Sequence, residues 1–422
     1  MSLTVHTLPN GLRVIVAPTA TSELVTFGAL VGMGNAHTCS PEVDILRQSL
    51  VDEHWRRPEA AGLRLSSETT IEHTWFELTS LRDASQMALE VLQATLMTPA
   101  GDDTAQRAAT RVMRMRGQYS DHVFYEAVDR ASHDLFAPHP YGTGSFDQPE
   151  QVPIVDGQCL ATLHARHCQP NTTVLVITGS ITGRMEQALQ DGFETWPNGR
   201  VTVNIPPVTP NMASVATYHR PGRQVQVAMT FSAPSYGADG AEATQLLAEI
   251  LGGKARIQDG RLRRAIRFEY NKVYDVFTEY MPYSLAGSFR IFTATTPDQV
   301  VDVVRLILRE LRRLEMEDIP TAELNRVQLR LCTSLAHRYQ ISSIRARSLT
   351  QSLAYAGRLW TWKEEAEALK KVTSKHVGDL LAKLAPSTSL NVTLVGPVQA
   401  GTEAAIKAMR AGDVPSREKQ RE

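Results

Sequence analysis

The order of predicted strands and helices in the first half of the chain recurs in the second half, and this repetition constrains the fold more than any other feature. In both halves, apolar runs of strand length alternate with helical patterns in the same succession. The predicted strands are 24–31, 74–81 and 173–177 in the first half and 224–232, 288–294 and 390–395 in the second. We therefore predict an α+β fold of two tandem homologous domains, each a mostly antiparallel sheet covered by helices.

A segment rich in Pro, Val and Thr separates the two halves. Such a composition is typical of a linker. The sequence thus predicts an N-terminal domain over 1–198, a linker over 199–214 and a homologous C-terminal domain over 215–410. Residues 411–422 are charged and nearly free of apolar side chains, so we expect a flexible tail there.

Capping residues and helical periodicity set the expected helix boundaries. Asp83 is a favourable N-cap for a helix over 84–97. In the second half, helical patterns without an internal Pro predict long helices over 321–356 and 362–384.

The composition argues against several classes of protein. Of the 422 residues, 42% are hydrophobic and 21% are charged, which is ordinary for a globular protein, and the net charge of −1 gives no general attraction to nucleic acid or anionic lipid. The four cysteines show no CxxC spacing, which favours a reducing compartment. No apolar run approaches the roughly 18 residues of a membrane span. The N-terminus predicts a strand rather than a signal or import leader, so we expect a cytoplasmic location.

The stretch 252–276 is the strongest candidate for a functional segment. A Gly-Gly turn leads into a basic amphipathic helix over 261–267, and a β-type run over 272–276 follows. This places Arg267 at the end of a helix and Tyr274 at the start of a strand. A guanidinium and a phenol brought together in this way can both donate hydrogen bonds to the carbonyl oxygens of an extended peptide. The alternative is an ordinary helix with a solvated Arg and a half-buried strand Tyr.

Several motifs in the correct order resemble those of the pitrilysin and mitochondrial-processing-peptidase family, the inverzincins. The stretch 252–276 resembles the family's "LGG…SRLF-x-x-LR-x-x-x-GLAYSV", and residues 8–12 match its opening "L-x-NGL-x-V". Residues 81–99, 139–142 and 167–179 resemble further family segments in the same succession. The resemblance covers nearly the whole chain. It implies that Arg267 and Tyr274 hold the backbone of a peptide substrate.

The same resemblance shows that the metal site of active members is not preserved. Those members carry H-x-x-E-H, in which two His and a distal Glu bind zinc and the motif Glu serves as general base. The ungapped register places Ile45, Gln48 and Ser49 on the H, E and H positions. Met115 stands where the distal Glu is expected. Ile45 has no lone pair and Ser49 is a poor zinc ligand, so we expect no metal in this chain.

A second register preserves the literal Glu-His pair at Glu53 and His54. It places Leu50 on the first His position and requires about five inserted residues, so it is also incomplete. His164 and His167, with Cys168 adjacent, are three residues apart on a predicted helix. No convergent carboxylate is evident in the sequence, and hydrogen-bonded or surface histidines without a metal are the favoured interpretation.

Together these features predict a non-catalytic, substrate-binding subunit of a heterodimeric zinc peptidase. The chain is expected to be inactive alone and to hold no cofactor, while a homologous partner subunit bearing H-x-x-E-H supplies the zinc and the general base. The expected substrates are unfolded peptides. Two alternatives remain open: a structural or scaffold homologue without a proteolytic role, and a metalloenzyme with atypical ligands.

Overall fold

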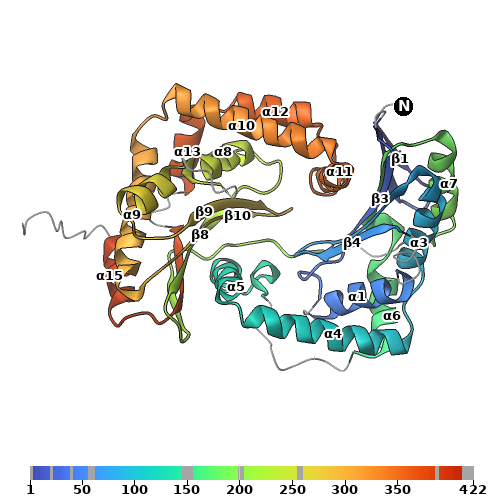
Figure 1. The fold of residues 1–422 in the computed structure, drawn as a ribbon, viewed down its shortest axis with the longest axis horizontal. Coiled ribbons are helices and arrows are strands. Elements are labelled where there is room, and N and C mark those ends of the chain that lie inside the picture. Colours follow the sequence, from blue (N-terminus) through green and yellow to red (C-terminus); the bar gives the residue numbers. More distant parts are fainter. Residues whose placement is uncertain are drawn as a thin grey trace, which may run out of the picture. The chain divides into compact units, whose positions relative to one another are not determined.

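We describe the protein from a computed structural model (Figure 1). It describes residues 3–19, 22–38, 41–55, 62–144, 155–197, 199, 204–253, 260–384 and 389–410. The predicted tail lies outside these residues, as does part of the predicted linker. The described linker residues 204–214 form no helix or strand.

The chain forms two compact units, and each contains a segment from the other half of the sequence. Unit 1 comprises Met1–Gln118, Asp147–Pro206 and Thr333–Glu365, and unit 2 comprises Tyr119–Phe146, Pro207–Cys332 and Ala366–Glu422. The predicted boundaries at 198 and 215 mark the duplicated halves of the sequence. The packed units follow those halves except for the two segments 119–146 and 333–365.

Unit 1 is built on a six-stranded sheet of order β1-β2-β6-β3-β5-β4. Its strands are β1 (Thr4–Thr7), β2 (Arg13–Pro18), β3 (Leu24–Val31), β4 (Arg64–Thr69), β5 (Thr74–Leu81) and β6 (Thr173–Gly179). Only the pairing of β2 with β6 is parallel, and the other four are antiparallel. The predicted strands 24–31 and 74–81 coincide with β3 and β5, because their apolar runs are unambiguous.

Both faces of this sheet are covered by helices (Figure 1). Alternate residues of a strand point to opposite faces. In β6, Leu175 and Ile177 join a core with α1 and α3, whereas Val174 and Val176 pack with Ala346 of α11. A strand covered on both faces therefore appears as a continuous apolar run in the sequence. The helices of this unit are α1 (Glu42–His54), α3 (Ser85–Met97), α6 (Gly157–His167), α7 (Gly183–Glu194) and α11 (Ser342–Ala356).

Unit 2 is built on a five-stranded sheet of order β7-β11-β8-β10-β9. Its strands are β7 (Val215–His219), β8 (Val225–Ala233), β9 (Val276–Pro282), β10 (Gly287–Thr295) and β11 (Asn391–Gly396). Again one pairing, β7 with β11, is parallel and the others are antiparallel. This order repeats the sequence β2-β6-β3-β5-β4 of the first sheet strand for strand. The predicted α+β fold with a duplicated, mostly antiparallel sheet is confirmed.

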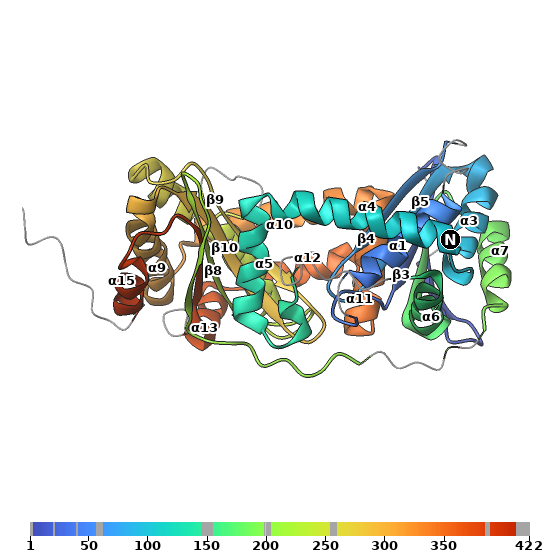
Figure 2. The ribbon, with the colours of Figure 1, turned by 90° about the horizontal axis from the view of Figure 1, so that it is seen from below.

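Helices also cover both faces of the second sheet. Figure 2 shows α5 on one side and α9 and α15 on the other. Helix α5 (Val123–Phe136) packs through Phe124, Val128 and Ala131 against Phe292 of β10 and Ala228 of β8. The other helices that contribute to this unit are α8 (Ala241–Leu251), α9 (Val300–Met316), α13 (Ser374–Leu384) and α15 (Thr402–Arg410).

The long helices α4 (Asp102–Ser120) and α10 (Thr321–Gln340) and the short α12 (Trp362–Lys370) complete the helices of the described residues. Short 3₁₀ turns occur at Arg82–Ala84, Pro140–Gly142, Pro170–Thr172 and Pro297–Gln299. In the part of the chain that the structure describes, no helix is both long and apolar enough to cross a membrane.

Three predicted helix boundaries are wrong. The helix expected over 321–356 breaks at Ile341, whose backbone is extended (φ −89°, ψ 112°). The helix expected over 362–384 is interrupted between α12 and α13. Neither break is marked by Gly or Pro, so periodicity alone could not locate it. Asp83 does not cap α3, because it lies within a 3₁₀ turn and Ala84 occupies the N-cap position without a side-chain bond.

Candidate functional site

The structure brings Arg267 and Tyr274 into direct contact within unit 2. The guanidinium carbon of Arg267 lies 4.9 Å from the centre of the Tyr274 ring and 5.5 Å from that of Phe268. Tyr274 is 77% exposed. It lies in the loop before β9 rather than in a strand, because β9 begins only at Val276. The expected position of Tyr274 at a strand start is therefore wrong, although its proximity to Arg267 holds.

Arg267 belongs to a π-helix, η4 (Arg263–Glu269), and not to the α-helix expected over 261–267. Its closing bond runs from the amide of Tyr270 to the carbonyl of Ala265, 3.2 Å away, and Lys272 N donates to Ile266 O at 2.9 Å. A π-helix is rare and often occurs at functional sites. Here it turns the side chains that follow Ile266 out of the buried face, so that Arg267 and Phe268 reach the surface.

The loop that carries Tyr274 is fixed on both sides by polar contacts. Thr293 Oγ1 donates to the carbonyl of Asp275 at 2.7 Å, and Thr295 Oγ1 donates to that of Lys272 at 2.9 Å. The buried Arg263 lies 3.6 Å from the Asp275 carboxylate. These contacts hold the backbone on either side of Tyr274 without using its hydroxyl.

Neither Arg267 nor Tyr274 makes a hydrogen bond or an ion pair with the described part of the chain. The guanidinium and the phenol hydroxyl are therefore free to donate to a ligand, and their mutual stacking holds them in one orientation. Two further exposed aromatic residues lie nearby in sequence, Phe268 at 54% and Tyr270 at 45% exposure. The arrangement can hold two carbonyl oxygens of an extended peptide.

The two positions that the resemblance assigns to the zinc-binding histidines are occupied by core residues. Ile45 is fully buried in the core between α1 and the first sheet. Ser49 is also fully buried, and its hydroxyl donates to the carbonyl of Leu46 at 2.8 Å. A methyl-bearing side chain and an internally bonded hydroxyl do not fit a zinc ion.

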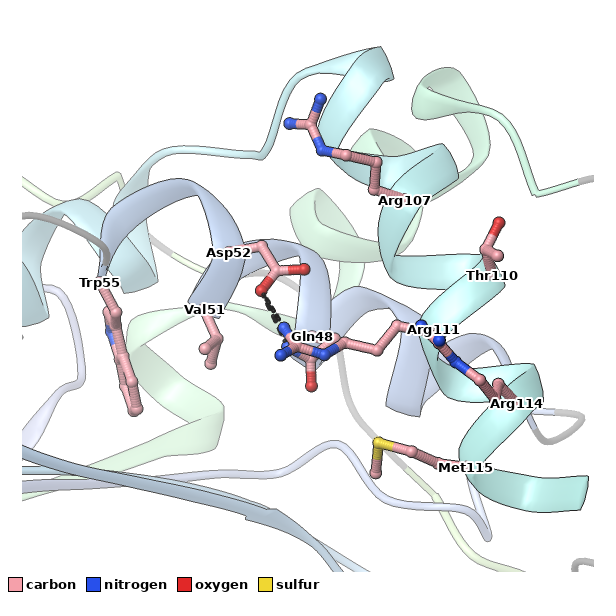
Figure 3. A pocket seen from close by; sticks show the side chains of 9 residues that line it. All are labelled: Gln48, Val51, Asp52, Trp55, Arg107, Thr110, Arg111, Arg114 and Met115. Atoms are coloured by element: carbon pink, nitrogen blue, oxygen red, sulfur yellow. Dashed lines mark hydrogen bonds and ion pairs between the residues drawn. The ribbon is translucent and has the colours of Figure 1, made fainter. Parts of the chain in front are cut away.

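Gln48 of α1 and Met115 of α4 line one cavity of about 850 Å³ (Figure 3). Beside them, the Asp52 carboxylate accepts hydrogen bonds from Gln48 Nε2 at 3.0 Å and from Arg111 Nη1 at 2.8 Å. The position that aligns with the general base thus carries an amide bonded to a carboxylate, and the position of the distal ligand carries a thioether. Asp52 and Arg111 were not singled out from the sequence.

The second register gives no metal site either. Leu50 is fully buried. The Glu53 carboxylate accepts a hydrogen bond from Thr104 Oγ1 at 2.6 Å, which contributes most to lowering its pKa, and His54 Nε2 lies 3.1 Å from the carbonyl of Thr98. Glu53 is thus bonded to the first turn of α4, and His54 contacts the connection between α3 and α4. Among the residues that the structure describes, no group of three or more His, Cys, Asp or Glu could hold a metal ion.

The predicted pair His164 and His167 is buried on α6. Burial lowers the pKa of His164 to about 4 and also lowers the pKa of His167, and it raises the pKa of the Cys168 thiol to about 12. The imidazoles are therefore neutral and the thiol protonated near pH 7. These groups are part of the interior of unit 1.

The chain is similar in sequence to known proteins. Residues 155–331 match the family model described as the Peptidase M16 inactive domain. An uncharacterized zinc protease of Bacillus subtilis, YmxG, is 21% identical over 398 residues, which cover 90% of this chain and 95% of that protein. Another of Mycobacterium tuberculosis, Rv2782c, is 22% identical over 413 residues, covering 93% and 92%.

Solved structures show the same fold. The peptidase M16 inactive domain from Pseudomonas fluorescens superposes with a TM-score of 0.83 at 16% identity, covering 95% of this chain and 99% of that one. A protease from Helicobacter pylori gives 0.83 at 14%, covering 94% and 99%. A chain of complex III2 from Candida albicans gives 0.81 at 15%, covering 96% and 100%.

In its duplicated fold and in the matched residues 155–331, this chain is similar to the M16 peptidases, the family of pitrilysin. Within that class, residues 155–331 correspond to the domain described as inactive. The resemblance predicted from the sequence is confirmed.

Proposed function

We propose that this chain is the non-catalytic, substrate-binding subunit of a heterodimeric zinc peptidase that processes unfolded peptides. A homologous partner subunit bearing H-x-x-E-H supplies the zinc and the general base. One observation carries the proposal: a half-buried Arg267 and an exposed Tyr274 lie in contact, and neither has a hydrogen-bond partner in the described residues.

The division of labour is physically reasonable. Arg267 offers a charged donor and Tyr274 a neutral one, and an extended peptide exposes its carbonyls to both. Two hydrogen bonds to backbone carbonyl oxygens fix the register and direction of the substrate independently of its side chains. Because η4 and the Asp275 contacts hold the pair before substrate arrives, little ordering free energy is lost on binding. Zinc in the partner would activate the attacking water.

The comparisons support this proposal at the level of the family. The relatives from Bacillus subtilis and Mycobacterium tuberculosis carry zinc protease names, and the matched domain is described as inactive. The low cysteine content and ordinary charge support a cytoplasmic location for the heterodimer.

The test is copurification from the native host followed by reconstitution. We expect a homologue with an intact H-x-x-E-H to copurify with this chain. Cleavage of an unstructured peptide should require both proteins, with neither active alone. If the two chains do not associate, or the homologue cleaves at the same rate without this chain, the proposal is refuted.

A scaffold role is the second candidate, and the fold shared with a chain of complex III2 favours it. In that case the copurifying proteins would form a stable assembly without peptide cleavage. Arg267 and Tyr274 would then be dispensable to assembly and function alike.

A further inference from the structure

The cavity between α1 and α4 is lined by a row of arginines that the proposed function does not use (Figure 3). Arg107, Arg111 and Arg114 follow each other at intervals of four and three residues on α4. Side chains at these intervals share one face of a helix. All three line the cavity, and every lining residue belongs to unit 1.

The positive charge of this row is only partly neutralised. Among the described residues, Asp52 is the acidic residue that lines the cavity, and the Glu53 carboxylate lies near enough to Arg107 for the guanidinium to lower its pKa. Arg111 Nη1 donates to Asp52 at 2.8 Å, and Arg107 Nη2 donates to Thr104 Oγ1 at 3.0 Å. Arg114 makes no hydrogen bond or ion pair with the described residues. The cavity thus retains a free guanidinium and a net positive lining.

Another part of the lining, on both helices, is apolar. Val51, Trp55 and Met115 contribute to it. The indole Nε1 of Trp55 donates to Thr95 Oγ1 at 3.0 Å, which fixes the ring. Apolar surface beside free donors favours a ligand that combines an anionic group with hydrocarbon. A single inorganic anion would occupy only a small part of about 850 Å³.

We propose that this cavity binds the carboxylate of an acidic residue in an extended peptide, with Arg114 as the main donor and Arg111 beside it. A planar guanidinium matches a carboxylate in a two-bond geometry, which an amide or hydroxyl ligand cannot reproduce. The neighbouring side chains Val51, Trp55 and Met115 contact the hydrocarbon part of the peptide. The inference rests on the proposed function only in taking the ligand to be a peptide.

The test measures direct binding to the isolated full-length chain. Two fluorescein-labelled, unstructured peptides differ only by Glu in place of Gln, and fluorescence anisotropy reports their affinity. The wild-type chain should bind the Glu peptide about tenfold more tightly than the Gln peptide. Arg114→Gln should lower the affinity for the Glu peptide about tenfold. Arg184→Gln is the matched control, because Arg184 is exposed on α7 of the same unit and has no partner in the described residues. The Arg184→Gln variant should bind the Glu peptide with the affinity of the wild type.

A thermal melt of each variant checks that the fold is kept. Arg111→Gln is a second variant, expected to weaken binding of the acidic peptide less because the Asp52 carboxylate already neutralises part of the Arg111 charge. Equal binding of the two peptides, or no effect of Arg114→Gln, overturns the assignment. So does binding of inorganic phosphate when neither peptide binds, since that identifies a small-anion site. Because no catalysis is measured, failure here leaves the reconstitution result unaffected, and a failed reconstitution leaves this binding result unaffected.

Discussion

The Arg267–Tyr274 surface of unit 2 and the cavity between α1 and α4 of unit 1 differ in what their polar groups are already bonded to. On the surface, neither donor has a partner in the described residues, and stacking alone orders the pair. In the cavity, Asp52 already accepts two hydrogen bonds and Arg114 alone keeps a guanidinium without a partner in the described residues, while Ile45 and Ser49 of α1 lie in the core. Free donors can serve a ligand, whereas buried apolar positions cannot be converted to a metal site without loss of packing.

The largest expected effect concerns metal and activity of the chain alone. Elemental analysis of the purified protein should give far less than one zinc per chain, because Ile45, Ser49 and Met115 do not ligate zinc. The isolated chain should also leave unstructured peptides intact. One zinc per chain, removed by a chelator together with peptidase activity, would instead support a metalloenzyme with atypical ligands. The cavity of unit 1 would then hold a metal site after all.

The next effect is on stability. Ile45→His should lower the free energy of unfolding by about 3 kcal/mol, because it removes a packed apolar side chain and buries an imidazole without a partner. Urea unfolding measures the change. Met115→His is the control: Met115 is 38% exposed, so its replacement should cost well under 1 kcal/mol. A variant with Ile45→His that keeps wild-type stability would show that α1 still has room for a ligand.

These two regions also show what the sequence could and could not predict. The repeat of strand order followed from apolar runs such as 24–31, and the nearness of Arg267 to Tyr274 followed from the motif. The π-helix at Arg263–Glu269 was missed, because its extra residue per turn leaves no signal in an amphipathic pattern.

The cavity was missed for a different reason. The spacing of Arg107, Arg111 and Arg114 was visible in the sequence, but a basic helix face is ordinarily solvated. Only the packing of α1 opposite α4 shows that this face borders a cavity and that Asp52 reaches Arg111. The partner of a charged residue depends on tertiary contacts, which single-sequence reasoning does not contain.

A smaller effect is expected for Arg267→Ala in the reconstituted heterodimer. A hydrogen bond from a charged donor contributes about 1.5–3 kcal/mol, so kcat/KM should fall by roughly 10- to 100-fold. Steady-state kinetics measures this, with gel filtration to verify assembly. Arg264→Ala is the matched control, because Arg264 lies in the same π-helix with a side chain that is 60% exposed. A loss of equal size in both variants would indicate general charge rather than a specific contact.

The smallest effect is expected for Tyr274→Phe, which removes the phenol hydroxyl and keeps the ring that stacks on Arg267. A neutral hydrogen bond contributes about 0.5–1.5 kcal/mol, so kcat/KM should fall by roughly two- to twelvefold. Tyr274→Ala should cost more, because Arg267 also loses the ring that orients it. Tyr270→Phe controls for loss of an exposed hydroxyl at a neighbouring aromatic residue, and it should leave kcat/KM unchanged. If Tyr274→Phe cleaves at the wild-type rate while Tyr274→Ala does not, the tyrosine positions Arg267 and the hydroxyl does not bind substrate.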